Sequence, residues 1–437
     1  MKANLYFKYK GKRNGTKKYK GKRSNKGKQK LKKTHKNIMI LDKKDYTNTY
    51  YLDSCLSFRK EYHMDRLVYH LERLGLKPDI MMKQINQKDA QFIKDRKIVL
   101  KDDECYQNYR VPKHFDSTKL KPMFMFQFTQ FLDKRFYDVN MYLGNFLNTN
   151  ELICLSKSMI YFQTKDFFPN IVKKHMKKTF LYLQFQKFEF PNIYILRPIN
   201  SSSGSDIFYV SNMQELLDAE KYYMNNNTYF EQDRMSHNFR VIASEYITNP
   251  LLYKTRKFHL RMYYLISYIN NNFNTFFLEN GKILTALYPF TLTKPFTKEV
   301  HDTHFDTTDG DILVPEAFLE KDLSVKNIEY SDIIKQMRTI LSAISSNINL
   351  EKSKLLYDNV KNGFCICGVD FMIDDTGTVI LIEVNSTPGL AFYKQANTNK
   401  FCDTIFNWVN ECVLEPCFKG TDPTKHPTYL PLLPIMQ

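Results

Sequence analysis

The stretch "FCICGVDFMIDDTGTVILIEVN", residues 364–385, contains two apolar runs separated by Asp-Asp-Thr-Gly at 374–377. Asp, Thr and Gly are common turn residues, and the flanking runs have the length of strands, so the stretch predicts a β-hairpin. We expect Ile373 to face Thr378 across this hairpin. That register fixes which side chains of the two strands share a face.

Two carboxylates and an amide fall on one face of the expected hairpin. The register places Asp370 opposite Leu381. Because side chains two residues apart share a strand face, Asp370, Glu383 and Asn385 point the same way. Three oxygen donors, two of them charged, suit Mg²⁺, and a bound cation would offset the cost of burying carboxylates. The alternative is the solvent-facing polar side of an ordinary hairpin, and this stretch alone leaves both interpretations open.

Two other stretches have residues that suit phosphate groups. "YILRPINSSSGSDIFYV" (194–210) predicts strand, Ser-Gly loop and strand, with Arg197 at the strand end. Such a loop offers hydroxyl and main-chain N–H groups to an anion, although a plain hairpin turn would have the same composition. "KFHLRMYYLIS" (257–267) alternates strictly, which places Lys257 and Arg261 on one strand face. Two cations there would suit a triphosphate, and the alternative is an exposed face with solvated charges.

Outside these stretches, periodicity predicts a few further elements. "IMILD" (38–42) is an expected strand, and residues 64–76 have the apolar spacing of a helix that Gly75 ends. Residues 330–344 predict an amphipathic helix with Ser331 as its N-cap. The Pro-rich residues from 414 onward predict irregular structure.

Composition adds a basic tail to a folded chain. The 437 residues are 43% hydrophobic and 15% aromatic, which is typical of a folded protein. Of the net charge of +18, residues 1–36 contribute sixteen Lys or Arg and no acid. We expect this tail to be disordered and to bind a polyanion, namely nucleic acid, an anionic membrane or an acidic protein tail, or else to act only as a solubilising segment. With no apolar run of 18 residues, no secretory signal and no CxxC among eight cysteines, we expect no membrane insertion and a reduced, intracellular compartment.

Five motifs together resemble those of the tubulin–tyrosine ligase-like family of ATP-grasp amino-acid ligases, over about residues 130–400. In chain order they are "FFPNIV" (167–172), "YILRPINSSSGSDI" (194–207), "SEYITNPLLYKTRKFHLR" (244–261), "HDTH" (301–304) and "GVDFMIDD…LIEVNSTPGL" (368–390). The resemblance implies an α+β fold with an ATP-grasp-type core, in which antiparallel and mixed sheets carry flanking helices and the nucleotide lies between two subdomains. The implied organisation is a disordered Lys-rich tail (1–37), an N-terminal α/β subdomain (38–125), a central (126–245) and a C-terminal (246–413) ATP-grasp subdomain, and a Pro-rich tail (414–437).

The resemblance also implies ATP and Mg²⁺, with two ions, as cofactors. The residues that match the family's Mg²⁺ ligands are Asp370, Glu383 and Asn385. Those that match its ATP-contacting positions are Arg197, Ser203, Gly204, the hinge residues Ser244, Glu245, Tyr246 and Ile247, and Lys257 and His259. Those that match its catalytic positions are Lys257, Arg261, Thr303 and His304.

The chain departs from the family pattern at several of these positions. At five positions this chain has a different residue from the family. Arg197 stands where the family has a lysine, Asp206 where it has a loop glycine, Ser244 where it has a glutamine, His259 where it has an aspartate and His304 where it has an asparagine. In the family, an arginine three residues after Gly281 grips the carboxylate of the incoming amino acid. Leu284 stands at that position here, with Lys282 as a possible substitute.

The activity implied by the resemblance is ATP-dependent ligation of a free amino acid to a protein carboxylate through an acylphosphate. The expected acceptor is tubulin, modified by glutamylation, glycylation or tyrosination, in the cytoplasm and on the cytoskeleton. The basic tail fits acidic tubulin tails. The alternatives are a catalytically inactive microtubule-binding member, an ATP-grasp ligase with another acceptor, and a nucleic-acid binder that depends on residues 1–36, although no folded nucleic-acid motif supports the last.

Overall fold

The structure is a computed structural model that describes residues 49–52, 65–78, 124–126, 152–154, 173–181, 187–198, 206–225, 241–303, 328–350, 362–385, 388–390 and 395–433. All of these belong to one compact unit, Asp45–Gln437. Several predictions therefore lie outside the described residues. They concern the tail 1–37, the strand 38–42, the motif 167–172, and Ser203, Gly204 and His304.

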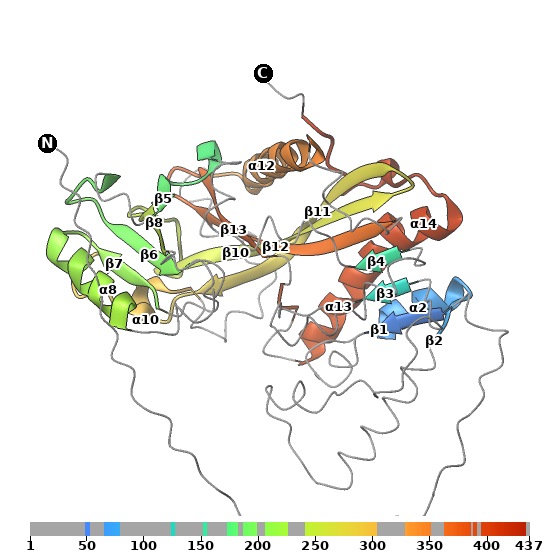
Figure 1. Ribbon diagram of the computed structural model, residues 1–437, viewed down its shortest axis with the longest axis horizontal. Coiled ribbons are helices and arrows are strands. Elements are labelled where there is room, and N and C mark those ends of the chain that lie inside the picture. The colour runs from blue at the N-terminus through green and yellow to red at the C-terminus, as the bar shows by residue number, and fades with distance from the viewer. Residues whose placement is uncertain are drawn as a thin grey trace, which may run out of the picture. The chain divides into compact units, whose positions relative to one another are not determined.

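The larger of the two described sheets has nine strands and is mixed. Its strands are β1 (Thr49–Leu52), β2 (Lys77–Pro78), β3 (Phe124–Phe126), β4 (Leu152–Cys154), β9 (Leu252–Tyr253), β10 (Arg256–Ile269), β11 (Asn272–Thr285), β12 (Gly363–Ile373) and β13 (Val379–Asn385). The order is β11-β10-β12-β4-β3-β1-β2, with β13 paired to β12 and β9 to β10 (Figure 1). Strands β9 to β13 pair antiparallel and β1 to β4 pair parallel, so the predicted α+β class with antiparallel and mixed sheets is confirmed.

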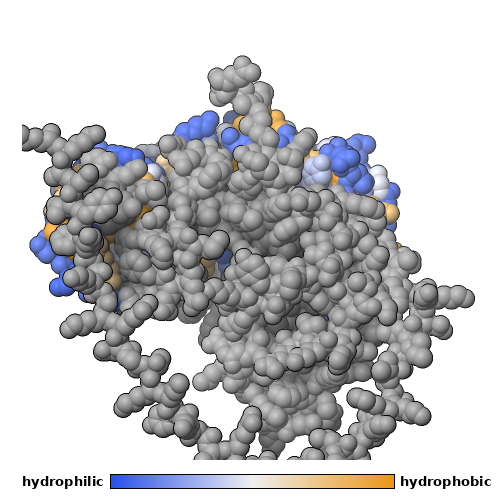
Figure 2. All heavy atoms as spheres, viewed as in Figure 1, coloured by the Kyte–Doolittle hydropathy of each residue, from blue (hydrophilic) through white to orange (hydrophobic). Residues whose placement is uncertain are grey.

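A smaller antiparallel sheet carries the Arg197 strand. Its order is β5-β8-β6-β7, with bounds β5 (Thr179–Leu181), β6 (Tyr194–Pro198), β7 (Phe208–Val210) and β8 (Val241–Glu245). Helix α8 (Met213–Asn225) buries Leu216 and Tyr223 in a shared core with this sheet. Hydrophobic side chains also reach the surface over α8 (Figure 2, left), where Met213 is exposed.

The long strand β10 is buried on both faces, and its apolar residues alternate between them. Phe258, Leu260, Met262, Tyr264 and Ile266 share a core with helix α12 (Tyr330–Leu350). Tyr263 and Leu265, on the other face, share a second core with α2 (Asp65–Arg73), α13 (Gln395–Val409) and the π-helix η7 (Asn410–Leu414). Lys257, His259 and Arg261 lie on this second face, nearer the start of the strand. They are buried, so the exposed-face alternative is wrong.

Helix ends agree only partly with the predictions. Helix α2 ends at Arg73, and Gly75 follows with φ +82°, the left-handed conformation that ends helices. Helix α12 begins at Tyr330, so the prediction of Ser331 as N-cap is wrong: Asp332 N–H bonds the carbonyl of Glu329, which draws the first turn one residue earlier.

The sequence predicted irregular structure from residue 414 onward, but part of this segment is helical. Helix α14 (Glu415–Lys419) continues directly from η7, and Pro416 follows the π-helical turn, an irregularity of the helical hydrogen-bond ladder of the kind found near prolines. The segment then forms the short 3₁₀-helix η8 (Pro423–Lys425) and bonds β11, with Leu430 N–H donating to Thr275. Within the described ranges no helix is long and apolar enough to cross a membrane, and Cys365 and Cys367 are packing residues in the core.

Candidate functional site

A β-bulge brings the two predicted carboxylates together. The hairpin β12–β13 pairs Ile373 with Val379, not with Thr378, so the predicted register is wrong by one residue. That shift alone would turn Glu383 away from Asp370. A bulge between Asp370 and Phe371 restores the parity, and Asp370 pairs directly with Glu383. The prediction that the carboxylates share a face is therefore confirmed, through a different register from the expected one.

Asp370 is the most buried member of the group, with 2% of its surface exposed. Arg261, its partner across β10–β12, donates Nε–H to Asp370 Oδ1 and Nη2–H to Oδ2, the latter at 2.8 Å. Asn385 Nδ2 lies 2.9 Å from Glu383 Oε1 and 3.4 Å from Asp370 Oδ2. Burial by itself lowers the pKa of Arg261, but the Asp370 carboxylate outweighs it and raises the pKa above its ordinary value. The solvent-facing alternative for this hairpin face is therefore wrong.

Gly368 provides the room that Arg261 needs to reach Asp370. It pairs with Asn385 on β13, and a Cβ at this position would lie 2.9 Å from Arg261 Cδ and 2.6 Å from Pro388 Cβ. Any side chain here would press on both the arginine and the proline. The glycine of the motif "GVDF" therefore permits the Arg261–Asp370 ion pair.

Lys257 lies nearby on the same face of β10, inside a polar and aromatic pocket. Its ammonium donates to Tyr246 OH and to the carbonyl of His301, each at 3.1 Å, and lies 4.3 Å from the centre of the Tyr246 ring. Burial lowers the pKa of Lys257 to about 7, with Asp302 opposing the shift and Arg197 adding to it. A buried lysine that ionises near neutrality responds readily to a bound anion.

The remaining predicted residues surround these two clusters. His259 Nδ1 lies 2.5 Å from Thr303 Oγ1, and its Nε2 lies 3.6 Å from Asp370 Oδ1. Arg197 reaches across from β6, with Nη1 3.7 Å from Glu383 Oε2. The structure thus brings the cations of two sheets to one pair of carboxylates.

The expected hinge, residues 244–247, is largely committed to the protein itself. Ser244 Oγ is hydrogen-bonded to Thr179 Oγ1, and the N–H groups of Glu245 and Tyr246 donate to the carbonyls of Lys178 and Ile193. Ile247 instead joins an apolar cluster on the carboxylate side of the hairpin, with Met372 and Ile380. That cluster places buried apolar side chains near the charged groups.

Sequence reasoning missed His301, Asp302 and Tyr209. His301 and Asp302 belong to the "HDTH" stretch, where only Thr303 and His304 were singled out, and both are buried beside Lys257. Tyr209 lies in β7 with its ring 5.6 Å from that of Tyr246. No spacing signal joins these residues, because they come from different strands and loops.

The register of β10–β11 also shows where Leu284, which stands in place of the family arginine, lies relative to the site. Leu284 pairs with His259 and Lys282 with Arg261, so both residues of β11 are on the face that carries the candidate site. Lys282 is buried there, with 8% of its surface exposed. A cation is therefore present on this face although the expected arginine is not.

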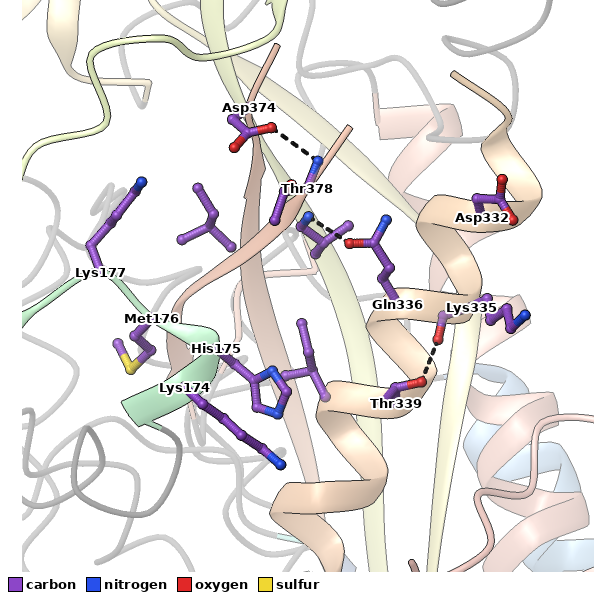
Figure 3. Close-up of a pocket in the computed structure, with 13 residues that line it drawn as sticks. Lys174, His175, Met176, Lys177, Asp332, Lys335, Gln336, Thr339, Asp374 and Thr378 are labelled. Atoms are coloured by element: carbon purple, nitrogen blue, oxygen red, sulfur yellow. Dashed lines mark hydrogen bonds between the residues drawn. The ribbon is translucent and has the colours of Figure 1, made fainter. Parts of the chain in front are cut away.

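A cavity of about 710 Å³ lies elsewhere, between the 3₁₀-helix η2 (Lys173–His175), α12 and the edge of β13 (Figure 3). The polar groups around it include Lys177 and Asp374, but Asp374 Oδ1 already accepts hydrogen bonds from Thr376 and Thr378. None of the charged site residues named above borders this cavity, although Ile380 of the apolar cluster does. The candidate site is defined by its buried charges, not by this hollow.

Comparisons with known proteins agree with the geometry. The family described as "Tubulin-tyrosine ligase family" matches residues 139–420. Tubulin glycylase 3C of Tetrahymena thermophila is 26% identical over 46% of this chain and 18% of its own length. Protein polyglycylase TTLL10 of Macaca fascicularis is 27% identical over 52% of this chain and 38% of its own length. The inactive polyglycylase TTLL10 of Homo sapiens is 25% identical over 52% of this chain and 35% of its own length. The chain thus spans less than half the length of each of these relatives.

Proposed function

Because the chain belongs to the tubulin-tyrosine ligase family, we propose that it is an ATP-dependent ligase that joins a free amino acid to a carboxylate of tubulin. The observation that carries the proposal is the buried cluster in which Arg197 and Arg261 meet Asp370 and Glu383. Cations of this kind neutralise phosphate oxygens, and paired carboxylates hold the cation that accompanies a nucleotide. The relatives' names add tubulin as the acceptor, and with it an association with the cytoskeleton.

The residue types at the hairpin fit Mg²⁺, since Asp370 and Glu383 are carboxylates and Asn385 has an amide oxygen. In the structure the Asn385 amide nitrogen faces both carboxylates, so the amide would have to rotate to bring its oxygen to the ion. Among the described residues no three His, Cys, Asp or Glu side chains form a metal-binding group, so the amide would have to be the third protein ligand. Asp370 would also have to share its oxygens with Arg261. When bound, Mg²⁺ would neutralise charge on the phosphates of ATP.

The protein's own residues then hold and align the reactants. Lys257 and Arg197 approach from two sheets and suit the phosphate oxygens, while Ile247 and its apolar neighbours suit a flat base. The γ-phosphoryl group passes to the acceptor carboxylate. The amine of the amino acid then displaces phosphate, forming the amide and releasing ADP and phosphate. Such transfers need alignment and charge neutralisation and require no enzyme nucleophile.

Lys282 is the residue we assign to the carboxylate of the amino acid. It pairs with Arg261 on the site face of β11, two residues from the position where the family arginine is replaced by Leu284. An ammonium gives one point contact where a guanidinium gives two, so a weaker grip on the amino acid is expected. This leaves glycine, glutamate and tyrosine all as candidate substrates.

The test is incorporation of labelled glycine, glutamate and tyrosine into tubulin with Mg-ATP, beside the Glu383→Gln variant. Incorporation of one label that is lost in the variant supports the proposal and identifies the amino acid. If Mg-ATP binds and no label is incorporated, a second function gains support: an inactive family member that binds microtubules, favoured by the leucine at 284. Label transferred to a protein other than tubulin would instead favour a different acceptor.

A further inference from the structure

His301 lies at the centre of an aromatic cluster beside the proposed phosphate-binding lysine. Only 3% of its surface is exposed. Its ring centre lies 5.2 Å from those of Tyr209 and Phe296, 5.5 Å from Tyr246 and 5.8 Å from Phe290. A phenylalanine would pack equally well among these rings. The presence of a histidine is therefore explained by the hydrogen bonds of its polar atoms.

Those atoms make a short hydrogen-bond chain that ends on Lys257. His301 Nδ1 lies 2.6 Å from Tyr246 OH, and Tyr246 OH accepts from the Lys257 ammonium at 3.1 Å. The main-chain carbonyl of His301 accepts a second ammonium hydrogen, also at 3.1 Å. One residue therefore reaches the lysine twice, directly through its carbonyl and indirectly through the tyrosine.

The protonation of His301 sets the direction of this chain. Burial and, to a smaller extent, the charge of Lys257 lower the pKa of His301 to about 4, so the imidazole is neutral at physiological pH. In the neutral tautomer that carries its hydrogen on Nε2, Nδ1 accepts the hydroxyl hydrogen of Tyr246, and the phenolic oxygen keeps its lone pairs for the ammonium. Without that acceptor, the hydroxyl hydrogen would be free to turn toward the lysine nitrogen, which favours the uncharged amine.

We propose that His301 is a positioning residue, which acts through the Tyr246 hydroxyl to hold Lys257 charged and aimed at the anionic group of the nucleotide. This inference rests on the proposed function, because it assigns the phosphate-binding role to Lys257. It adds a pair of residues, the imidazole of His301 and the hydroxyl of Tyr246, whose side chains act without touching the ligand.

The charge of Lys257 also depends on groups from every neighbouring element. These are Tyr246 after β8, His301 and Asp302 after the short helix α10 (Lys298–His301), Arg197 on β6, Tyr209 on β7 and His259 on β10. Burial raises the pKa of Tyr209 and of Tyr246, so both stay neutral, and Asp302 is the acid that supports the charged lysine against Arg197. While His301 holds its hydrogen, the Tyr246 hydroxyl acts as an acceptor for the ammonium, so its loss removes a partner of the charged lysine.

The experiment is calorimetric measurement of Mg-ATP binding between pH 6.5 and 9 by the full chain. The variants are Tyr246→Phe, His301→Phe and His301→Asn, with Tyr69→Phe as the matched control, because Tyr69 is exposed on α2. His301→Phe keeps an aromatic ring, and His301→Asn places an amide oxygen near the position of Nδ1. Thermal unfolding of each variant checks that it is folded.

We expect Tyr246→Phe and His301→Phe each to weaken Mg-ATP binding roughly ten-fold at pH 7.5, because each removes support for a charged donor. Their affinity should fall at a lower pH than that of the native chain, whereas His301→Asn and Tyr69→Phe should keep the native pH profile. A native profile in His301→Phe, or equal impairment in His301→Asn and His301→Phe, would leave His301 a packing role only and overturn the inference. If His301→Phe does not fold, a native profile in Tyr246→Phe overturns it alone. Absence of Mg-ATP binding by the native chain would refute the proposed function itself, and is distinguishable because it needs no variant.

Discussion

Replacing Gly368 by alanine tests whether the Arg261–Asp370 pair depends on a bare backbone at this point of β12. The new Cβ would lie 2.6 Å from Pro388 Cβ and 2.9 Å from Arg261 Cδ. Neither atom is the free end of a flexible side chain, since proline is a ring and the guanidinium is fixed by two hydrogen bonds to Asp370. The contact can be relieved only by moving the arginine, the loop that carries Pro388, or both.

The size of the effect follows from two costs. Overpacking a buried position costs about 1–3 kcal/mol. Displacing Arg261 adds part of the roughly 3–5 kcal/mol that separates a paired buried carboxylate from an unpaired one. We therefore expect Gly368→Ala to lower the free energy of unfolding by about 2–4 kcal/mol and to weaken Mg-ATP binding at least ten-fold. Urea unfolding and calorimetric titration measure the two effects.

Gly389→Ala is the matched control, because it lies one residue after Pro388 and its Cβ would meet nothing within 4 Å. We expect this variant to change stability by no more than about 1 kcal/mol, in the stabilising direction. If Gly368→Ala unfolds at the same urea concentration as Gly389→Ala and binds Mg-ATP equally well, the steric reasoning about Arg261 is refuted.

Two further variants separate nucleotide binding from later steps. Burial lowers the pKa of Lys257 from 10.5 to about 7, so between those values the unfolded chain holds the extra proton and native stability rises with pH. Lys257→Met should therefore raise the thermal midpoint at pH 7.5 and abolish Mg-ATP binding, and a lower midpoint would contradict the assigned burial cost. Lys282→Met should leave Mg-ATP binding within about two-fold of native and reduce amino-acid incorporation at least ten-fold, because one charged contact to the amino acid is lost. Equal loss of both activities would show that Lys282 does not distinguish the amino acid from the nucleotide.

The sequence predicted the alternation of β10 and the shared face of the two carboxylates, because both depend on the period-2 geometry of a strand. It did not predict the register of the hairpin. The turn after Ile373 is one residue longer than expected, and a bulge then restores the parity between Asp370 and Glu383. A bulge leaves no reliable signal in composition, so a face prediction can be correct while the register behind it is wrong.

The surroundings of Lys257 were not predictable, for a different reason. Tyr246, His301 and Tyr209 come from different segments of the chain and meet only when the two sheets pack together. Residues in one strand share a face by spacing, whereas residues brought together by packing have no fixed separation. The lysine was found because β10 has a clear period, and Tyr246 was named only through the family resemblance, whereas His301 and Tyr209 were not found.

The charge balance of the site argues that metal and nucleotide would bind together. Arg261 already neutralises Asp370, and Arg197 lies beside Glu383. A divalent cation alone would add positive charge beside two arginines, and a nucleotide alone would bring phosphates toward two carboxylates. If both were bound, Asp370 and Glu383 would be available to hold the cation, and the two arginines and Lys257 to hold the phosphates, so that every buried charge would keep a partner of opposite sign. On the proposed function, the ion pairs between the arginines and the carboxylates would therefore hold these charges until the metal and the nucleotide bind.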